Sequence, residues 1–288
     1  MADDAITIVI IALLGGDALS ACRAAVEPLG HSIIVVHADG HIEGGPAALD
    51  SPPNVPSRRR AGAEAAVTPI VAFLEDTAVP MQGWDRDIAK YLADGTGIAA
   101  VGGPVVIGAR LSAKSAALAV TEFGRYQPES WALQIAANDA DALPGVNFAF
   151  RRDALLAATE DTKCLIDGET FSRLKQAGWR MVGLPSMTVE YRHNHHLGAA
   201  LSTRYFHGCI FAGQRLASAS ILQRAFGSAK ALLLPFILSA RAISKLPKGL
   251  KAPLSTCAWI VAQESAWSAG EFTGALRGKA VLRLSRWN

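Results

Sequence analysis

Three short apolar runs, all rich in β-branched residues, most restrict what this chain can fold into. They read ITIVIIALL (6–14), SIIVVHAD (32–39) and PIVAFLED (69–76). Their length and composition are typical of buried strands, and helix-like stretches lie at 17–29, 57–67 and 84–93. Strands that alternate with helices indicate crossover connections. The sequence therefore predicts an α/β fold with a mostly parallel sheet flanked by helices.

Acidic side chains follow two of these runs. Asp39 ends the second run, and Glu75 and Asp76 end the third. Because ligands of such sheets bind at the carboxyl ends of the strands, we expect the three acids near one cleft. Glu75 and Asp76 are adjacent on an extended segment, so their side chains should point to opposite sides. The stretch FLEDTAVP (73–80) is thus consistent with a metal site or with a strand end that carries two solvated acids.

The middle of the chain continues the pattern with less regularity. A further strand is expected at 97–106, and a loop over the cleft at 126–143. The stretch 144–156 predicts a turn, a strand and a helix start, and 167–185 predicts a helix ended by Gly178 and then a strand. Asp167 or Glu169 falls in the first turn of that helix, where an acid suits the helix dipole or a plain cap.

Charge is distributed unevenly over the 288 residues. The net charge is +3, but residues 201–288 hold twelve Lys or Arg and two acids. Such asymmetry suggests an anionic partner for the basic part, and we divide the chain into a domain at 1–200 and a basic region at 201–288. The four cysteines are scattered without a C-x-x-C pair, which favours buried thiols in a reducing compartment. Asp3 and Asp4 argue against reading 5–16 as a secretory signal.

The basic region is expected to be helical, with two helices in 197–245 and one in 253–285. No segment reaches the ~18 uninterrupted apolar residues of a spanning helix. Basic residues recur among apolar ones: Arg204, Arg215, Arg224, Lys230, Arg241, Lys245, Lys248 and Lys251, with tryptophans at Trp259, Trp267 and Trp287. This pattern predicts helices on an anionic membrane surface, the alternative being ordinary helices with a solvated basic face. No nucleic-acid-binding module is visible.

Several motifs, in this order and spacing, resemble the family 2 glycosyltransferases of the GT-A fold. They are IVVHADG (34–40), RRRAGAEAA (58–66), IVAFLED (70–76), Pro80 with Gly83 and Trp84, VGGPV (101–105), PGVNFAFRR (144–152), the helix D-x-E-x-x-x-R-L-x-x-AG-x-R (167–180) and VEYRHNHH (189–196). The resemblance covers about residues 5–215. It implies a GT-A (Rossmann-like) domain that transfers a sugar from a nucleotide-sugar donor, UDP- or GDP-linked, to an acceptor hydroxyl. The segment WSAGEFTGALRG (267–278) resembles the tail of bacterial membrane-associated members.

The resemblance also implies roles for individual residues. Asp39 would take the uridine side of the donor, Arg59, Arg60 and Asn147 would lie near the nucleotide, and Glu75 would contact the donor or the metal. Asp76, Glu75 and His193, with His195 as the next match, would hold Mg²⁺ or Mn²⁺ at the diphosphate. Hard cations prefer such oxygen ligands and would neutralise the leaving group. Asp167 would be the catalytic base that deprotonates the acceptor hydroxyl, with inversion at the anomeric carbon.

Two positions depart from the family pattern. Thr77 stands where a second acid of Asp-x-Asp is usual, and Ile166 precedes Asp167 where another acid is common. The segment RHNHH (192–196) is open to a zinc site, an auxiliary Mg²⁺ or Mn²⁺ ligand, or a polar surface or acceptor contact. We therefore expect a metal-dependent glycosyltransferase at the inner face of the cell membrane, with a lipid-linked or envelope acceptor. The alternative is a catalytically degenerate binding or scaffolding subunit. A nucleotidyl transferase is disfavoured because Gly15-Gly16-Asp17 lacks a basic residue.

Overall fold

The computed structural model describes residues 6–45, 54–135, 139–216, 218–247, 250 and 252–277. The described residues of Met1–Val106 and Tyr126–Arg192 form one compact unit, and those of Ile107–Arg125 and His193–Trp287 form another. The predicted boundary at residue 200 therefore differs from the observed division. A segment from the middle of the chain joins the C-terminal helices, because its helix α4 (Ala113–Phe123) packs on them.

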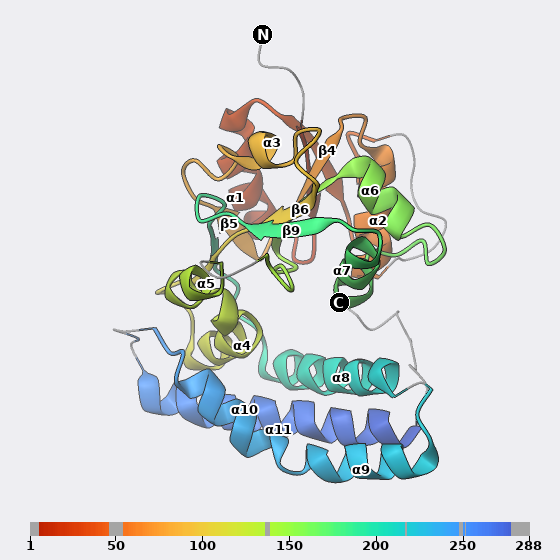
Figure 1. Ribbon diagram of the computed structural model, residues 1–288. Coiled ribbons are helices and arrows are strands. Elements are labelled where there is room, and N and C mark those ends of the chain that lie inside the picture. Colours follow the sequence, from red (N-terminus) through yellow and green to blue (C-terminus); the bar gives the residue numbers. More distant parts are fainter. Residues whose placement is uncertain are drawn as a thin grey trace. The chain divides into compact units, whose positions relative to one another are not determined.

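The first unit is built on a mixed seven-stranded sheet with helices against it (Figure 1). The strand order is β3-β2-β1-β4-β8-β6-β9, with bounds β1 Ile6–Ile11, β2 Ser32–Val36, β3 Ile42–Glu43, β4 Ile70–Glu75, β6 Ile98–Gly102, β8 Asn147–Arg151 and β9 Arg180–Gly183. The pairs β1–β2, β1–β4 and β6–β9 are parallel. The pairs of β3 with β2 and of β8 with β4 and β6 are antiparallel. The sheet is mixed because β3, next to β2, and β8, between β4 and β6, run antiparallel to their neighbours.

The register of the parallel strands places the C-terminal ends of β1, β2 and β4 side by side at one end of the sheet. Ile11 of β1 lies opposite Val36 of β2 and also opposite Glu75 of β4. Asp76 follows the end of β4 directly, and Asp39 comes three residues after the end of β2. The sheet interior is apolar: Phe73, Phe148 and Phe150 are buried and pack edge to face. Such a core gives this end of the sheet a rigid base.

The helices of the first unit agree with most of the sequence expectations. They are α1 Gly16–Val26, α2 Val55–Ala65, α3 Ile88–Tyr91, α5 Pro128–Ile135, α6 Arg152–Ala158 and α7 Asp167–Gln176, with 3-10 turns at Glu27–Leu29 and Gly124–Tyr126. Helix α2 begins after Asn54, whose side chain accepts a hydrogen bond from Ser57 N, a regular N-cap. Asp17 lies in the first turn of α1, where Gly15 is the N-cap.

Two expectations about local structure were wrong. The stretch 126–143 is not one loop, because Pro128–Ile135 forms α5, in which Trp131 is buried against Tyr126. The stretch 97–106 is not one strand: it divides into β6 and β7 (Val105–Ile107), and β7 joins a separate sheet with order β5-β10-β7. The other strands of this small sheet are β5 Ala78–Pro80 and β10 Val189–Tyr191.

The second unit is helical. It contains α4, α8 (Leu197–Arg215), α9 (Ile221–Ala231), α10 (Leu234–Ile243) and α11 (Pro253–Arg277). Three helices thus occupy 197–245, where two were expected, and α4 was not expected at all. Helix α11 lies between α8 on one side and α9 with α10 on the other (Figure 1). Lys248, Lys251 and Trp287, which the sequence pattern included, lie outside the described residues.

Candidate functional site

Arg59 joins two of the acids that the sequence singled out. It lies on α2 with only 7% of its side chain exposed. One terminal nitrogen (Nη2) donates to Glu75 Oε1 at 2.8 Å and to the Gly145 carbonyl at 2.8 Å, and the other (Nη1) donates to Asp167 Oδ1 at 2.7 Å. The guanidinium also lies 5.0 Å from the centre of the Phe148 ring. Residues from α2, β4 and α7 therefore meet at this one cation.

Asp167 faces this cation and is not the cap of its own helix. It is the first residue of α7, and the N-cap residue Ile166 makes no side-chain cap bond. Glu169, the other acid of the first turn, is turned away and pairs with Arg173 at 2.9 Å. A Cβ atom at Gly145 would lie 2.7 Å from Asp167 Oδ2 and 2.9 Å from the Arg59 guanidinium. Any side chain at 145 would thus force the carboxylate of Asp167 or the guanidinium of Arg59 to shift from its present position.

Asp76 holds the loop that follows β1. Its carboxylate is buried and accepts hydrogen bonds from Leu13 N at 2.9 Å, from Leu14 N at 2.9 and 3.2 Å, and from Gly15 N at 2.8 Å. Successive backbone N–H groups of this kind form an anion-binding nest. Backbone amides of the loop after β1 therefore occupy both carboxylate oxygens of Asp76. The carboxylate lies at the C-terminal end of β4, next to Glu75 in the chain.

The acidic segment does not fit a divalent metal as it lies. Asp76 is held by backbone amides and Glu75 by Arg59. Thr77, at the position of the missing acid, is buried, and its hydroxyl has no hydrogen-bond partner among the residues that the structure describes. Across the described residues, no group of three or more His, Cys, Asp or Glu side chains is placed to hold a metal ion. The Mg²⁺ or Mn²⁺ site of Asp76, Glu75 and His193 therefore stays a prediction.

Asp39 lies in an exposed turn after β2. Its carboxylate accepts a hydrogen bond from His41 N at 3.0 Å, and this bond is the main cause that lowers its pKa. Val36 and Glu75 end strands that flank β1, so their backbones lie about two strand spacings, roughly 10 Å, apart. Asp39 is thus an accessible anion at the same end of the sheet, as the predicted contact with the sugar–base part of a nucleotide requires.

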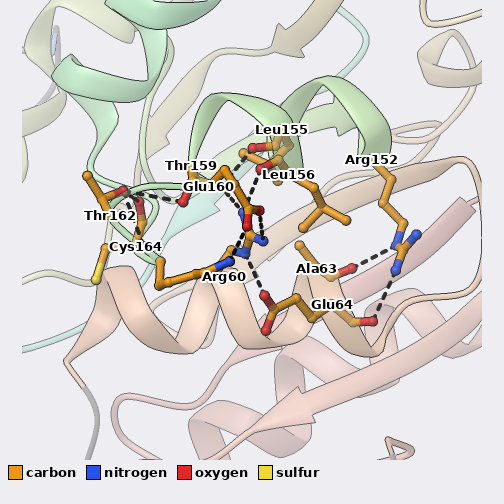
Figure 2. Close-up of polar contacts among 11 residues, drawn as sticks. Arg60, Ala63, Glu64, Arg152, Leu155, Leu156, Thr159, Glu160, Thr162 and Cys164 are labelled. Carbon is orange, nitrogen blue, oxygen red and sulfur yellow. Dashed lines mark hydrogen bonds and ion pairs between the residues drawn. The ribbon is translucent and has the colours of Figure 1, made fainter.

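Arg60 points to a different side of α2 from Arg59. Its guanidinium is buried between α2 and α6, where it donates to the Leu156 carbonyl at 2.7 Å and pairs with Glu64 at 2.8 Å and Glu160 at 3.3 Å (Figure 2). Figure 2 also shows Arg152, which donates to the carbonyls of Ala63 and Glu64 at the end of α2. Both arginines fasten α2 to α6, so a direct contact of Arg60 with a nucleotide would require these bonds to break.

Asn147 is also committed to the fold. It is fully buried at the start of β8, and its Oδ1 accepts from Trp84 Nε1 at 2.8 Å. Its Nδ2 donates to the Met187 carbonyl at 2.5 Å and lies 3.4 Å from the Pro104 carbonyl. The motif residues Trp84 and Asn147 therefore stabilise each other. The side-chain amide of Asn147 would have to give up these hydrogen bonds to contact a nucleotide-sugar.

His193 belongs to the second unit, where it stacks edge to face with His195 at 4.1 Å between ring centres. Burial lowers the pKa of His195 to about 4, and the nearby charge of His193 acts in the same direction. His195 N donates to Ser115 Oγ at 2.9 Å, and Ser112 N donates to Asn194 Oδ1 at 2.8 Å. The segment after β10 is thus attached to the start of α4.

Sequence reasoning did not give a separate role to Arg58. This residue is 1% exposed and donates to the Ala12 carbonyl at 2.8 Å, beside the loop that Asp76 holds. Burial lowers its pKa, while the charges of Glu75 and Asp76 act in the opposite direction. The signal in the sequence was the run of three arginines at the start of α2. Two of them, Arg58 and Arg59, place guanidinium groups near the acidic segment.

Replacing Asp76 by alanine should lower the free energy of unfolding by about 2–4 kcal/mol, because three backbone N–H groups would lose their acceptor. Urea unfolding measured by circular dichroism would test this. Asp76→Asn should show a smaller loss, since its amide keeps one acceptor oxygen. If Asp76→Ala is as stable as the wild type but loses metal-dependent donor binding, Asp76 is a metal ligand and not the support of the loop.

Comparisons with known proteins leave the family open. No family model matches the chain, and no curated protein matches its sequence. Among solved structures, the mannosyltransferase PcManGT from Pyrobaculum calidifontis, in complex with GDP-Man and Mn²⁺, is similar over 90% of this chain and 85% of that chain. The identity is 16% and the TM-score is 0.49. A similarity of this degree does not establish a shared fold family or activity.

Proposed function

We propose that the chain is a glycosyltransferase that moves a sugar from a nucleotide-diphosphate donor to an acceptor hydroxyl. One observation carries the proposal: Arg59, Glu75 and Asp167 come from three separate motifs of the resemblance and meet within 2.8 Å contacts. The GT-A assignment, the inverting stereochemistry and a lipid-linked or envelope acceptor are parts of the same proposal. Each rests on the resemblance of the sequence to family 2.

In this proposal Asp39 and Asp167, which lie near the C-terminal ends of the strands, have different roles. Asp39, exposed after β2, binds the nucleoside part of the donor. Asp167 accepts the proton of the acceptor hydroxyl: 38% of its side chain is exposed, and Arg59 orients the carboxylate by holding Oδ1. A positioned carboxylate of this kind contributes typically 10²–10⁴-fold to rate. The guanidinium groups of Arg58 and Arg59 lie near three carboxylates here, those of Glu75, Asp76 and Asp167, so binding of a diphosphate at this place needs further positive charge.

A second function is favoured by one specific observation. Asp76 is fully used by backbone amides and Thr77 replaces the other acid of the motif, so the metal-binding segment lacks two of its usual ligands. A chain that binds nucleotide-sugars without turning them over would have this arrangement. The degenerate binding subunit therefore remains the second candidate.

A thermal-shift screen over UDP- and GDP-sugars, with and without Mn²⁺, tests the proposal and separates the two candidates. A donor at a hundred times its Kd should stabilise the chain by about 2.7 kcal/mol, which corresponds to roughly 5–10 °C in Tm. Nucleoside monophosphates and free sugars are the matched controls and should shift Tm less. Binding together with hydrolysis of the same donor supports the enzyme, and binding without hydrolysis supports the subunit. A screen in which no donor shifts Tm contradicts both.

A further inference from the structure

Helices α9 and α10 turn their large apolar side chains outward. In α9 Leu222 is 80% exposed and Phe226 61%, and in α10 Phe236 is 75% exposed and Ile237 51%. We call the set Leu222, Phe226, Leu232, Leu233, Phe236 and Ile237 the α9–α10 apolar face. Six large apolar side chains exposed on two consecutive helices are unusual on a water-soluble chain and indicate an interaction surface.

The side of these two helices that faces the rest of the unit is lined by small residues. Ser228 and Ala231 of α9 and Ser239 and Ala242 of α10 are buried. The Ser228 hydroxyl lies 3.0 Å from the Arg224 carbonyl of its own helix and 3.4 Å from the Phe272 carbonyl of α11, and its one hydrogen is donated to either or shared between them. A helix packed against a core in water has the opposite distribution, with its large apolar residues inside. Large residues outside and small ones between helices are the arrangement of helices that face lipid.

The contact between α8 and α11 has the same character. Cβ atoms added at Gly208, Gly270 and Gly274 would lie 2.0–2.3 Å from carbonyl oxygens of the facing helix, so the two backbones touch. Gly270 and Gly274 form a G-x-x-x-G spacing, which is typical of close helix contacts in membranes. A buried ion pair, Arg204 with Glu264 at 2.8 Å, lies in this contact. Small and polar residues therefore lie between the helices of the second unit, and large apolar residues are exposed on α9 and α10.

The charges around the apolar face are positive. Residues 191–263 contain neither Asp nor Glu. Lys230 and Arg241 are exposed on α9 and α10, and Lys230 Nζ lies 4.4 Å from the centre of the Phe226 ring, at the border of the apolar face. Arg125 and Arg241 are close enough to Lys245 that their charges, added to the effect of burial, lower its pKa. A surface of phosphate groups would complement these cations.

The shape of the helix pair limits how deeply it can enter a bilayer. Within the described residues no single helix is long and apolar enough to cross a membrane. Taken together, α9 and α10 are long and apolar enough, but they form a pair bent by 49°. Two helices of 11 and 10 residues measure about 15 Å each at 1.5 Å per residue. A bent pair of that size with Lys230 and Arg241 on its surface suits the headgroup–acyl boundary of one leaflet.

We propose that the α9–α10 apolar face inserts into one leaflet of an anionic lipid bilayer, with Lys230, Arg241 and Lys245 at the lipid phosphates. The partner is a lipid surface of negative charge. This docking needs no nucleotide-sugar and holds whether or not the chain transfers sugar. If it does, the bilayer would present a lipid-linked acceptor to the same chain.

Flotation with vesicles tests the proposal on the full chain without donor or metal. Wild-type protein should float with phosphatidylcholine vesicles that contain phosphatidylglycerol. The double variant Phe226→Ser and Phe236→Ser should bind at least about a hundredfold more weakly, since each buried aromatic ring contributes tenfold or more. The double variant Lys230→Gln and Arg241→Gln should lose about fivefold per charge on the anionic vesicles and little on pure phosphatidylcholine.

Val67→Ser is the matched control for apolar exposure. Val67 is 91% exposed in the first unit, so its loss should leave flotation unchanged, and circular dichroism should show all variants folded. Wild-type protein that stays at the bottom at low salt overturns the proposal, as does equal flotation of the Phe226→Ser, Phe236→Ser variant. If sedimentation shows a dimer that this variant dissociates, and no vesicle binding, a second copy covers the face and the lipid proposal is overturned. Donor hydrolysis, measured separately without vesicles, reports on the proposed activity alone.

Discussion

Arg59→Met should lower the free energy of unfolding by about 3–5 kcal/mol, because removal of one partner leaves buried opposite charges uncompensated. Glu75 is 13% exposed at its side chain and depends on this guanidinium, and Asp167 and the Gly145 carbonyl would lose the same donor. Methionine is unbranched and close to the length of the aliphatic part of arginine, so it removes the guanidinium, with its contact to Phe148, and keeps most of the apolar stem. Urea unfolding at neutral pH, with the slope of the transition compared between variants, measures the loss of stability.

A second substitution and a surface pair provide the controls. Glu75→Gln in the Arg59→Met background should restore about 1–2 kcal/mol, since the uncompensated carboxylate is then gone. Arg180 makes an equally short double contact with Asp139, at 2.8 and 2.9 Å, but both side chains are well exposed. Arg180→Met should therefore cost no more than about 1 kcal/mol. Equal effects of Arg59→Met and Arg180→Met would contradict a buried charge centre at Arg59.

The strands of the first unit were largely readable from the sequence. β1, β2 and β4 are short β-branched runs, and their pattern depends only on local burial. The order of the strands was not readable in the same way. β8 runs antiparallel between β4 and β6, and this pairing joins residues far apart in the chain, such as Ala72 with Ala149. Nothing local in a strand sequence states which neighbour it will have.

The sequence named candidate site residues but not the contacts between them. From the strand ends we expected Asp39, Glu75 and Asp76 near one cleft. The structure brings Arg59, Glu75 and Asp167 together. Arg60 and Asn147 lie in the same motifs but bond to the protein interior. Successive residues of a helix point about 100° apart, and here Arg59 faces Glu75 whereas Arg60 faces α6. Which of the two faces the acidic segment is decided by tertiary packing.

The second unit shows a different limit. Basic residues among apolar ones indicated an anionic surface, yet the side of α9 and α10 that carries Phe226 and Phe236 could not be assigned from periodicity. Hydrophobic periodicity assumes that large apolar residues face inward, and here Ser228 and Ser239 do so instead. The reversal becomes visible only in the structure, where the hydroxyls of Ser228 in α9 and Ser268 in α11 are each within hydrogen-bond distance of a backbone carbonyl of the facing helix.

Asp167→Asn should reduce turnover of the donor by about 10²–10⁴-fold while the protein stays folded, because an amide cannot accept the proton of the acceptor hydroxyl. The amide oxygen introduced by this substitution could still accept from Arg59, so the fold and donor binding should be retained. Initial rates with a saturating donor would measure the loss, and the thermal shift by the same donor would show that binding persists. Glu169→Gln is the matched control: this acid lies in the same helix turn but pairs with Arg173, so its loss should change the rate less than about threefold. If the Asp167→Asn variant keeps its turnover, Asp167 is not the catalytic base. Reduction of turnover in both variants by a similar factor would indicate that α7 supports the site only through its stability.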